Sequence, residues 1–149
     1  MKKYLLITLL VGFCFGQNNA TYAEFGGAGY TMTFNYERIF NENFIARIGY
    51  GYDKQNRGQE SITFYPFGGG YLIGKENQKI EMCVGVTFIN GALTMNGEVL
   101  EPNLKTTFFG FGYRYNIGKN KLLLGLKGYY LFLDKFSAPW AGVSIGTSF

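Results

Sequence analysis

Five charged residues stand out because each one interrupts a segment of apolar and small residues. They are Glu37, Arg47, Glu81, Arg114 and Lys127. Two carboxylates can act as a general acid and a general base, and three cations can hold an anionic solute or line a conducting pore. Which of these roles is open to them depends on the elements that carry them and on their surroundings.

The sequence offers little else for catalysis. It has no His, the commonest general base and metal ligand, and Cys83 therefore has no imidazole to activate its thiol. Glu37 and Glu81 fall on predicted strands that are not adjacent, so we do not expect their carboxylates to converge. Segment 69–75 spells G-x4-G-K, but it lacks the Ser or Thr and the helix that a phosphate-binding loop needs. We predict a protein that is not an enzyme and holds no cofactor and no metal.

Composition narrows the fold class. The 149 residues include 22 Gly, 15 Phe, 12 Tyr and one Trp but only 3 Pro, and 16% are charged. So many aromatic residues exclude a disordered chain, and the low Pro content excludes collagen. A helical bundle is disfavoured because Gly in a helix interior costs about 1 kcal/mol relative to Ala. Gly together with Tyr and Phe indicates strands joined by tight turns, so we predict one all-β domain.

The first 16 residues have the pattern of a signal peptide. Two lysines precede an apolar run over 4–15, which is too short to cross a bilayer as a helix. We predict cleavage after Gly16, with later positions up to 23 as alternatives, and a mature domain over 17–149. Acylation of Cys14 is a further alternative.

Removal of the leader changes the charge and the thiol count. It takes two of the 14 cations and none of the 10 anions, so the formal charge falls from +4 to +2. No basic run remains to indicate nucleic acid as a partner. Cys83 is then the single thiol, which excludes an internal disulfide.

Period-2 alternation of apolar and small residues recurs along the mature chain and predicts eight strands. The predicted ranges are 17–25, 30–38, 44–52, 61–73, 79–89, 106–116, 121–131 and 140–149. Segment 61–73 is apolar on both faces, and its three consecutive glycines leave its register open. Segment 17–25 brings the chain to the correct end for the next strand, although it could instead thread the lumen.

The two faces of these strands distinguish a soluble protein from a membrane protein. One face is long, apolar and aromatic, and the other consists of Gly, Ser, Thr and a few charged residues. Lipid outside and a narrow polar interior satisfy both faces together. We therefore predict an eight-stranded antiparallel up-and-down transmembrane β-barrel. A soluble secreted calycin-like binding barrel is a second alternative.

This fold directs the five charged residues inward. Arg or Lys on the lipid face costs about 2–4 kcal/mol near the bilayer midplane. In a narrow interior, Glu37, Arg47, Glu81, Arg114 and Lys127 must pair or stay hydrated. We predict a salt-bridge network that closes the lumen, with a solute-binding or conducting lumen as the alternative.

Short and long connections alternate, as in barrels with tight periplasmic turns and longer outer loops. We expect a two-residue hairpin at Gly26-Gly27, loops over 53–60 and 132–139, and a hairpin extension or a partner-contact surface over 90–105. The aromatic residues then fall into two belts at the membrane surfaces. The predicted periplasmic belt holds Tyr36, Phe44, Tyr113, Tyr115 and Phe149, and the predicted outer belt holds Tyr30, Tyr50, Tyr52, Tyr130 and Trp140.

The ending PWAGVSIGTSF over 139–149 resembles the terminal strand by which Gram-negative outer-membrane barrels are recognised for assembly. It alternates apolar residues and finishes on the aromatic Phe149. This ending and the segments Asn35–Arg38 and Gly112–Tyr115 resemble the sequences of a largely uncharacterised family of small Gram-negative outer-membrane β-barrels. These barrels are about the size of OmpA and OmpX.

The resemblance implies a location in the cell outer membrane. It implies outer-membrane lipid and the barrel assembly machinery as partners, and Phe149 as the assembly signal. It brings no catalytic residues. We therefore expect a small closed barrel with a structural or surface-interaction role and no catalysis, and a narrow transport or ligand-binding barrel is the first alternative. The sequence does not identify a surface partner.

Overall fold

The computed structural model describes residues 19–54, 61–75, 77–91, 93–95, 98–100, 103–118, 122–133 and 137–149. The predicted signal peptide and positions 17 and 18 lie outside these residues. Among the described residues, no helix is both long and apolar enough to cross a membrane.

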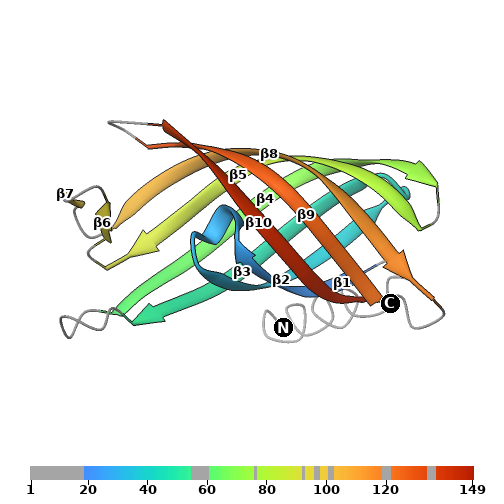
Figure 1. The fold of residues 1–149 in the computed structure, drawn as a ribbon, viewed down its shortest axis with the longest axis horizontal. Coiled ribbons are helices and arrows are strands. Elements are labelled where there is room, and N and C mark those ends of the chain that lie inside the picture. Colours follow the sequence, from blue (N-terminus) through green and yellow to red (C-terminus); the bar gives the residue numbers. More distant parts are fainter. Residues whose placement is uncertain are drawn as a thin grey trace, which may run out of the picture.

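Eight strands close into one antiparallel barrel (Figure 1). They are β1 (Asn19–Gly26), β2 (Met32–Phe40), β3 (Phe44–Lys54), β4 (Ser61–Lys75), β5 (Gln78–Asn90), β8 (Leu104–Ile117), β9 (Leu122–Phe132) and β10 (Ser137–Ser148). Around the barrel the order is β1, β10, β9, β8, β5, β4, β3 and β2, so the strands follow one another in chain order and the last meets the first. The predicted fold class is confirmed.

The barrel closes where β1 pairs with β10. Asn19 N donates to Phe149 O at 2.7 Å, and Phe149 N donates to Asn19 O at 2.8 Å. Because β1 is part of the wall, the alternative in which this segment threads the lumen is wrong. We call the end of the barrel that holds Asn19 and Phe149 the terminal end. The opposite end, where β1, β3, β5 and β9 end, is the loop end (Figure 1).

Alternation along each strand separates an outer face from an interior face. In β8, Phe109 and Phe111 are exposed, whereas Phe108 and Arg114 are buried. β4, whose register the sequence left open, obeys the same rule and turns Phe64 inward.

Large apolar side chains cover the outside of the barrel on every strand. Examples, one from each strand, are Phe25, Phe34, Ile48, Phe67, Val84, Phe111, Leu126 and Val143. Soluble monomers rarely expose a contiguous apolar surface of this extent. A lipid bilayer is the environment in which such a surface is stable.

The predicted outer belt of aromatic residues is partly wrong. Tyr50, Tyr52 and Tyr130 lie on the outside and are 43% to 51% exposed. Tyr30 is only 7% exposed and belongs to the interior. Trp140 pairs with the interior residue Tyr129 along β10 and packs on Tyr30, with ring centroids 6.4 Å apart. Tyr30 therefore does not belong to the outer belt, whereas Trp140 is 40% exposed near the loop end.

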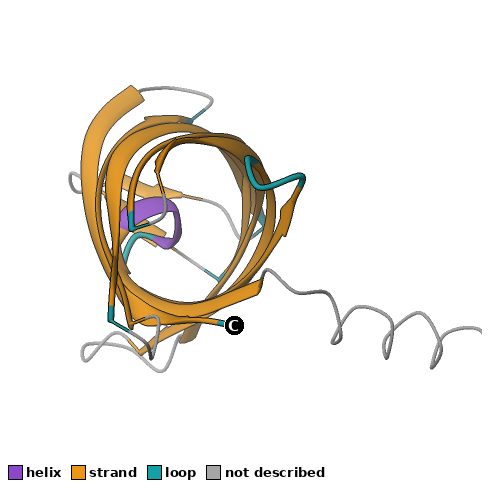
Figure 2. Cartoon of the chain, turned by 90° about the vertical axis from the view of Figure 1, so that its right-hand side faces the viewer, coloured by secondary structure: helices purple, strands orange, loops and turns teal. Residues whose placement is uncertain are grey.

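The first connection also differs from the two-residue hairpin expected at Gly26-Gly27. Gly27–Gly29 form the 3-10 helix η1, which lies inside the ring of strands (Figure 2). Gly26 and Gly27 have φ values of 74° and 69°, which Gly adopts without a steric penalty. Tyr30 follows with φ 66°, which a residue with a Cβ rarely adopts. The chain thus turns inward before β2 begins at Met32.

Two further connections differ in detail from the expectation. β6 (Leu93–Met95) and β7 (Glu98–Leu100) form a separate two-stranded sheet. They do not extend the ladder between β5 and β8, which ends at the pair Ile89 and Leu104. The connection expected over 132–139 is shorter, because β10 begins at Ser137.

The outer surface yields the first testable prediction. Leu126 lies at the middle of β9 and is 62% exposed. Leu126→Arg should lower the free energy of unfolding in lipid vesicles by about 2–4 kcal/mol, because the charge enters the hydrocarbon. Phe132→Arg, at the loop end of the same strand, should cost only about 0–1 kcal/mol. Denaturant unfolding measures both values, and equal small losses would contradict a lipid-facing surface.

Candidate functional site in the barrel interior

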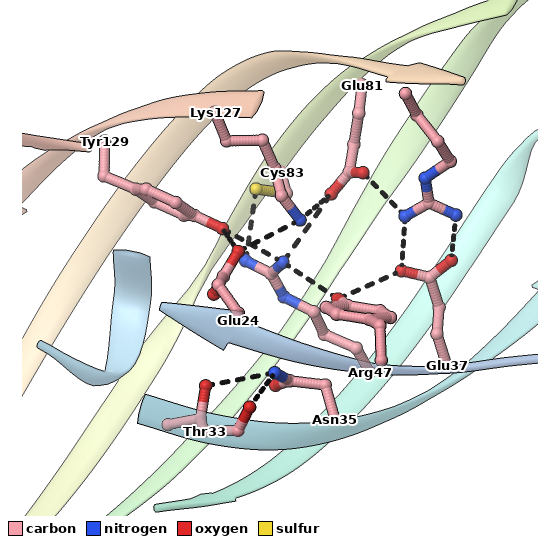
Figure 3. Close-up of polar contacts among 11 residues, drawn as sticks. Glu24, Thr33, Asn35, Glu37, Arg47, Glu81, Cys83, Lys127 and Tyr129 are labelled. Atoms are coloured by element: carbon pink, nitrogen blue, oxygen red, sulfur yellow. Dashed lines mark hydrogen bonds and ion pairs between the residues drawn. The ribbon is translucent and has the colours of Figure 1, made fainter. Parts of the chain in front are cut away.

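The five charged residues come from five strands and meet inside the barrel (Figure 3). Glu37, Arg47, Glu81, Arg114 and Lys127 are each at most 5% exposed. Strand alternation turns them inward, and an eight-stranded barrel is narrow enough for side chains from opposite walls to touch. A continuous chain of ion pairs links all five.

Arg114 is the central cation. Its Nη1 and Nη2 atoms donate to the two oxygens of Glu37 at 2.5 and 2.9 Å, and Nη2 also donates to Glu81 Oε2 at 2.6 Å. The planar guanidinium suits this two-point contact. Our expectation that the carboxylates of Glu37 and Glu81 would not converge is wrong. Glu81 reaches Arg114 from the neighbouring strand β5, and Glu37 reaches it from β2 across the lumen.

Glu81 connects Arg114 to the other two cations. Lys127 Nζ donates to Glu81 Oε1 at 3.1 Å, and Arg47 Nη1 lies 3.6 Å from the same oxygen. Lys127 Nζ also lies 3.3 Å from Oε1 of Glu24, a β1 residue that is 1% exposed. One lysine therefore bridges carboxylates from two separate strands.

Glu24 is the interior residue that the sequence analysis missed. The five predicted residues leave one cation in excess, whereas Glu24 brings the described interior to three carboxylates and three cations. That unbalanced charge was the available signal, because a buried cation without a counter-ion is costly. We call Glu24, Glu37, Arg47, Glu81, Arg114 and Lys127 the interior network.

Arg47 joins the interior network to aromatic side chains. Its Nη1 donates to Tyr129 Oη and its Nη2 to Cys83 Sγ, both at 3.2 Å. The guanidinium carbon lies 5.2 Å from the ring centroid of Phe108 and 5.7 Å from that of Tyr129, within cation–π range. Tyr129 in turn donates to Glu24 Oε1 at 2.8 Å. The Arg47 guanidinium is therefore stabilised by the Tyr129 hydroxyl and by two aromatic rings as well as by the more distant Glu81 carboxylate.

An apolar cluster fills the loop end of the interior. Its members are Ala28, Tyr30, Ile62, Phe64, Cys83, Ile89, Phe108, Tyr129 and Leu131. Glycines provide the space for two of the rings. A Cβ on Gly85 would lie 2.5 Å from Phe108 Cζ, and one on Gly110 would lie 2.7 Å from Tyr129 Cε1. The interior is therefore charged around the network and apolar between the network and the loop end.

Residues 27–31, which we call the plug, complete this cluster. Thr87 Oγ1 donates to Ala28 O at 2.7 Å, and Tyr30 Oη donates to Thr106 Oγ1 at 2.9 Å. The Tyr30 ring packs on Phe64, with centroids 5.8 Å apart. The first connection is thereby fastened to the neighbouring strands β4, β5 and β8 on the opposite wall of the barrel.

The geometry holds charge in place and offers no catalytic constellation among the described residues. Glu37 and Glu81 are both engaged by Arg114, and the Cys83 thiol faces Arg47 and the apolar cluster. The described part of the chain contains no group of three or more His, Cys, Asp or Glu side chains that could hold a metal ion. Segment 69–75 lies within β4, and the next described element is the strand β5.

No protein-family model and no curated protein matches the sequence. Among solved structures, the chain is similar to the N-terminal β-barrel domain of Pseudomonas aeruginosa OprF, with a TM-score of 0.63 and 12% identity over 89% of this chain and 96% of that one. It is also similar to the Yersinia pestis outer membrane protein Ail in a phospholipid bilayer nanodisc, with a TM-score of 0.56 and 13% identity over 89% and 97% of the two chains. At these identities the likeness establishes the fold alone.

The fold is that of small outer-membrane β-barrels. The resemblance drawn from the terminal strand is confirmed at this level, and the predicted location in the outer membrane agrees with it. The neighbours do not distinguish a structural role from a transport role, so that distinction depends on the interior.

The interior network yields the second prediction. Glu81→Ala would leave Arg114, Lys127 and Arg47 without their shared carboxylate in a confined site. Breaking a buried ion pair costs about 3–5 kcal/mol, so the free energy of unfolding should fall by about that amount.

Glu42→Ala provides the control, because it removes a carboxylate from an exposed turn. Denaturant unfolding in the same vesicles compares the two variants. Equal stability of the Glu81→Ala protein and the parent would show that the network does not stabilise the barrel.

Proposed function

We propose that this protein is a closed outer-membrane barrel with a structural or surface-interaction role and no catalysis. The observation that carries the proposal is the filled interior, in which the neutral six-residue network lies beneath the apolar cluster and the plug. A barrel of this kind can display loops at the cell surface without opening a path across the membrane.

Three features support the outer-membrane location. The outer face carries large apolar side chains on all eight strands, and the predicted leader would direct the chain out of the cytoplasm. The final residue, Phe149, is aromatic, 50% exposed and hydrogen-bonded through its backbone to Asn19 at the barrel seam. We propose that Phe149 is the assembly signal and that the terminal end faces the periplasm.

Closure of the lumen follows from charge and packing. Each carboxylate of the network contacts at least one cation, so an ion entering the lumen would have to break existing pairs. Toward the loop end, Phe64 and Phe108 are fully buried within the apolar cluster. The network opposes conduction because its ion pairs would have to break, and the apolar cluster opposes it because an ion would have to lose its water.

A surface role would belong to the loop end. Most of the longer connections between strands reach this end, including the one that carries the β6–β7 sheet. Segment 55–60 and several residues around β6 and β7 lie outside the described residues, so a partner-contact surface over 90–105 stays a proposal.

Planar-bilayer recording tests the closed lumen against the transport alternative. The unmodified protein should show no steady conductance. Replacing the plug residues 27–31 with the two-residue turn Asn-Gly removes Ala28 and Tyr30 from the apolar cluster but leaves the interior network in place. A variant that keeps heat-modifiable mobility on gels should therefore also show no steady conductance.

Conductance in that variant alone would show that the plug, and not the interior network, closes the lumen. Stable open channels formed by the unmodified protein would contradict the proposal and favour a narrow transport barrel.

A further inference from the structure

A groove of about 790 Å³ crosses the outside of the barrel over β10, β1, β2, β3 and β4. Volumes of this size are typical of sites for small organic ligands. The groove lies on the membrane-spanning wall and not in the lumen, so the proposed closure of the barrel does not explain it.

The groove exists because β1 carries small residues on its outer face. Ala23 pairs with Phe34 on one side and with Ile145 on the other, and all three line the groove. Side chains directly opposite one another in paired strands have Cβ atoms about 4.5–5.5 Å apart. A methyl group between two large side chains therefore leaves a depression between them.

The chemistry of the lining changes from one end of the groove to the other. None of the lining residues is charged. Near the terminal end, Thr21 pairs with Thr147, and Tyr36 Oη donates to Asn19 Oδ1 at 2.9 Å. Toward β4 the lining becomes aromatic, where Tyr50 packs on Tyr65 with ring centroids 5.6 Å apart.

We propose that this groove binds an acyl chain of a phospholipid from the surrounding bilayer, with its headgroup at the terminal end. The proposal rests on the membrane location proposed above. The groove is continuous with the lipid-facing surface, since Phe34, Ile48 and Ile145 belong to both. A flexible hydrocarbon chain can fill an uncharged depression, and the hydroxyl-bearing end suits the polar part of the lipid.

A second copy of the chain fits this surface less well. A two-fold dimer brings the same patch of both copies together, and two depressions that face each other enclose a void. The terminal end would face the periplasm, so the lipid is a phospholipid of the inner leaflet and not a lipopolysaccharide.

The test uses the mature chain folded into vesicles of phosphatidylethanolamine and phosphatidylglycerol and then extracted into detergent. Native mass spectrometry counts the phospholipid molecules that remain bound. Ala23→Phe fills the depression. Ala141→Phe is the matched control, because it makes the same substitution on the exposed face of β10 outside the groove.

The parent and the Ala141→Phe protein should both retain phospholipid, and retention by the Ala23→Phe protein should fall several-fold. Equal retention by all three proteins would overturn the groove as a site. A dimer that Ala23→Phe dissociates would overturn it in favour of a second copy, and displacement of phospholipid by added lipopolysaccharide would overturn the choice of lipid. If the proposed membrane location is wrong, the result differs from all of these, because the folded chain would stay soluble without lipid or detergent.

Discussion

The pairing of Arg114 with Glu37 and Glu81 is the interaction on which the rest of the interior depends. A charged side chain in a membrane-spanning strand lowers the stability of the barrel if it faces lipid, so it turns inward. Inside, it needs a partner, because an isolated buried charge is far more costly than a paired one. Arg114 meets both requirements through contacts of 2.5 to 2.9 Å to two strands that are not adjacent. The network therefore also ties opposite walls of the barrel together.

The other interior side chains balance the charge of this pairing and fill the rest of the lumen. Lys127 and Glu24 complete the neutral set, and Arg47 extends it to the aromatic rings. Glycines paired with Phe108 and Tyr129 on the neighbouring strands leave room for those rings, and the plug fastens the first connection inside the barrel. The outer face is left to apolar side chains, with a depression where β1 carries Thr21 and Ala23. The barrel thus has an apolar exterior, and its interior contains a charged network and apolar clusters.

Most of the fold could be predicted from the sequence, because alternation over long segments fixes both strand and face. Residues near the first connection could not. In β1, Thr21 and Ala23 on the outside are no more apolar than Ala20 and Tyr22 on the inside, so the segment gives no clear orientation for Glu24. Tyr30 was placed outside by extending the alternation of β2 backward, but β2 begins at Met32. The convergence of Glu37 and Glu81 was missed because distance around the sheet is not distance across a narrow lumen.

The reactivity of Cys83 tests the closed interior most directly. Its thiol is 2% exposed and lies 3.2 Å from Arg47, between the network and the apolar cluster. With Cys14→Ser, Cys83 is the only thiol in the chain. A small charged thiol reagent should modify the folded protein in vesicles orders of magnitude more slowly than the unfolded chain. Comparable rates in the two states would contradict a filled lumen.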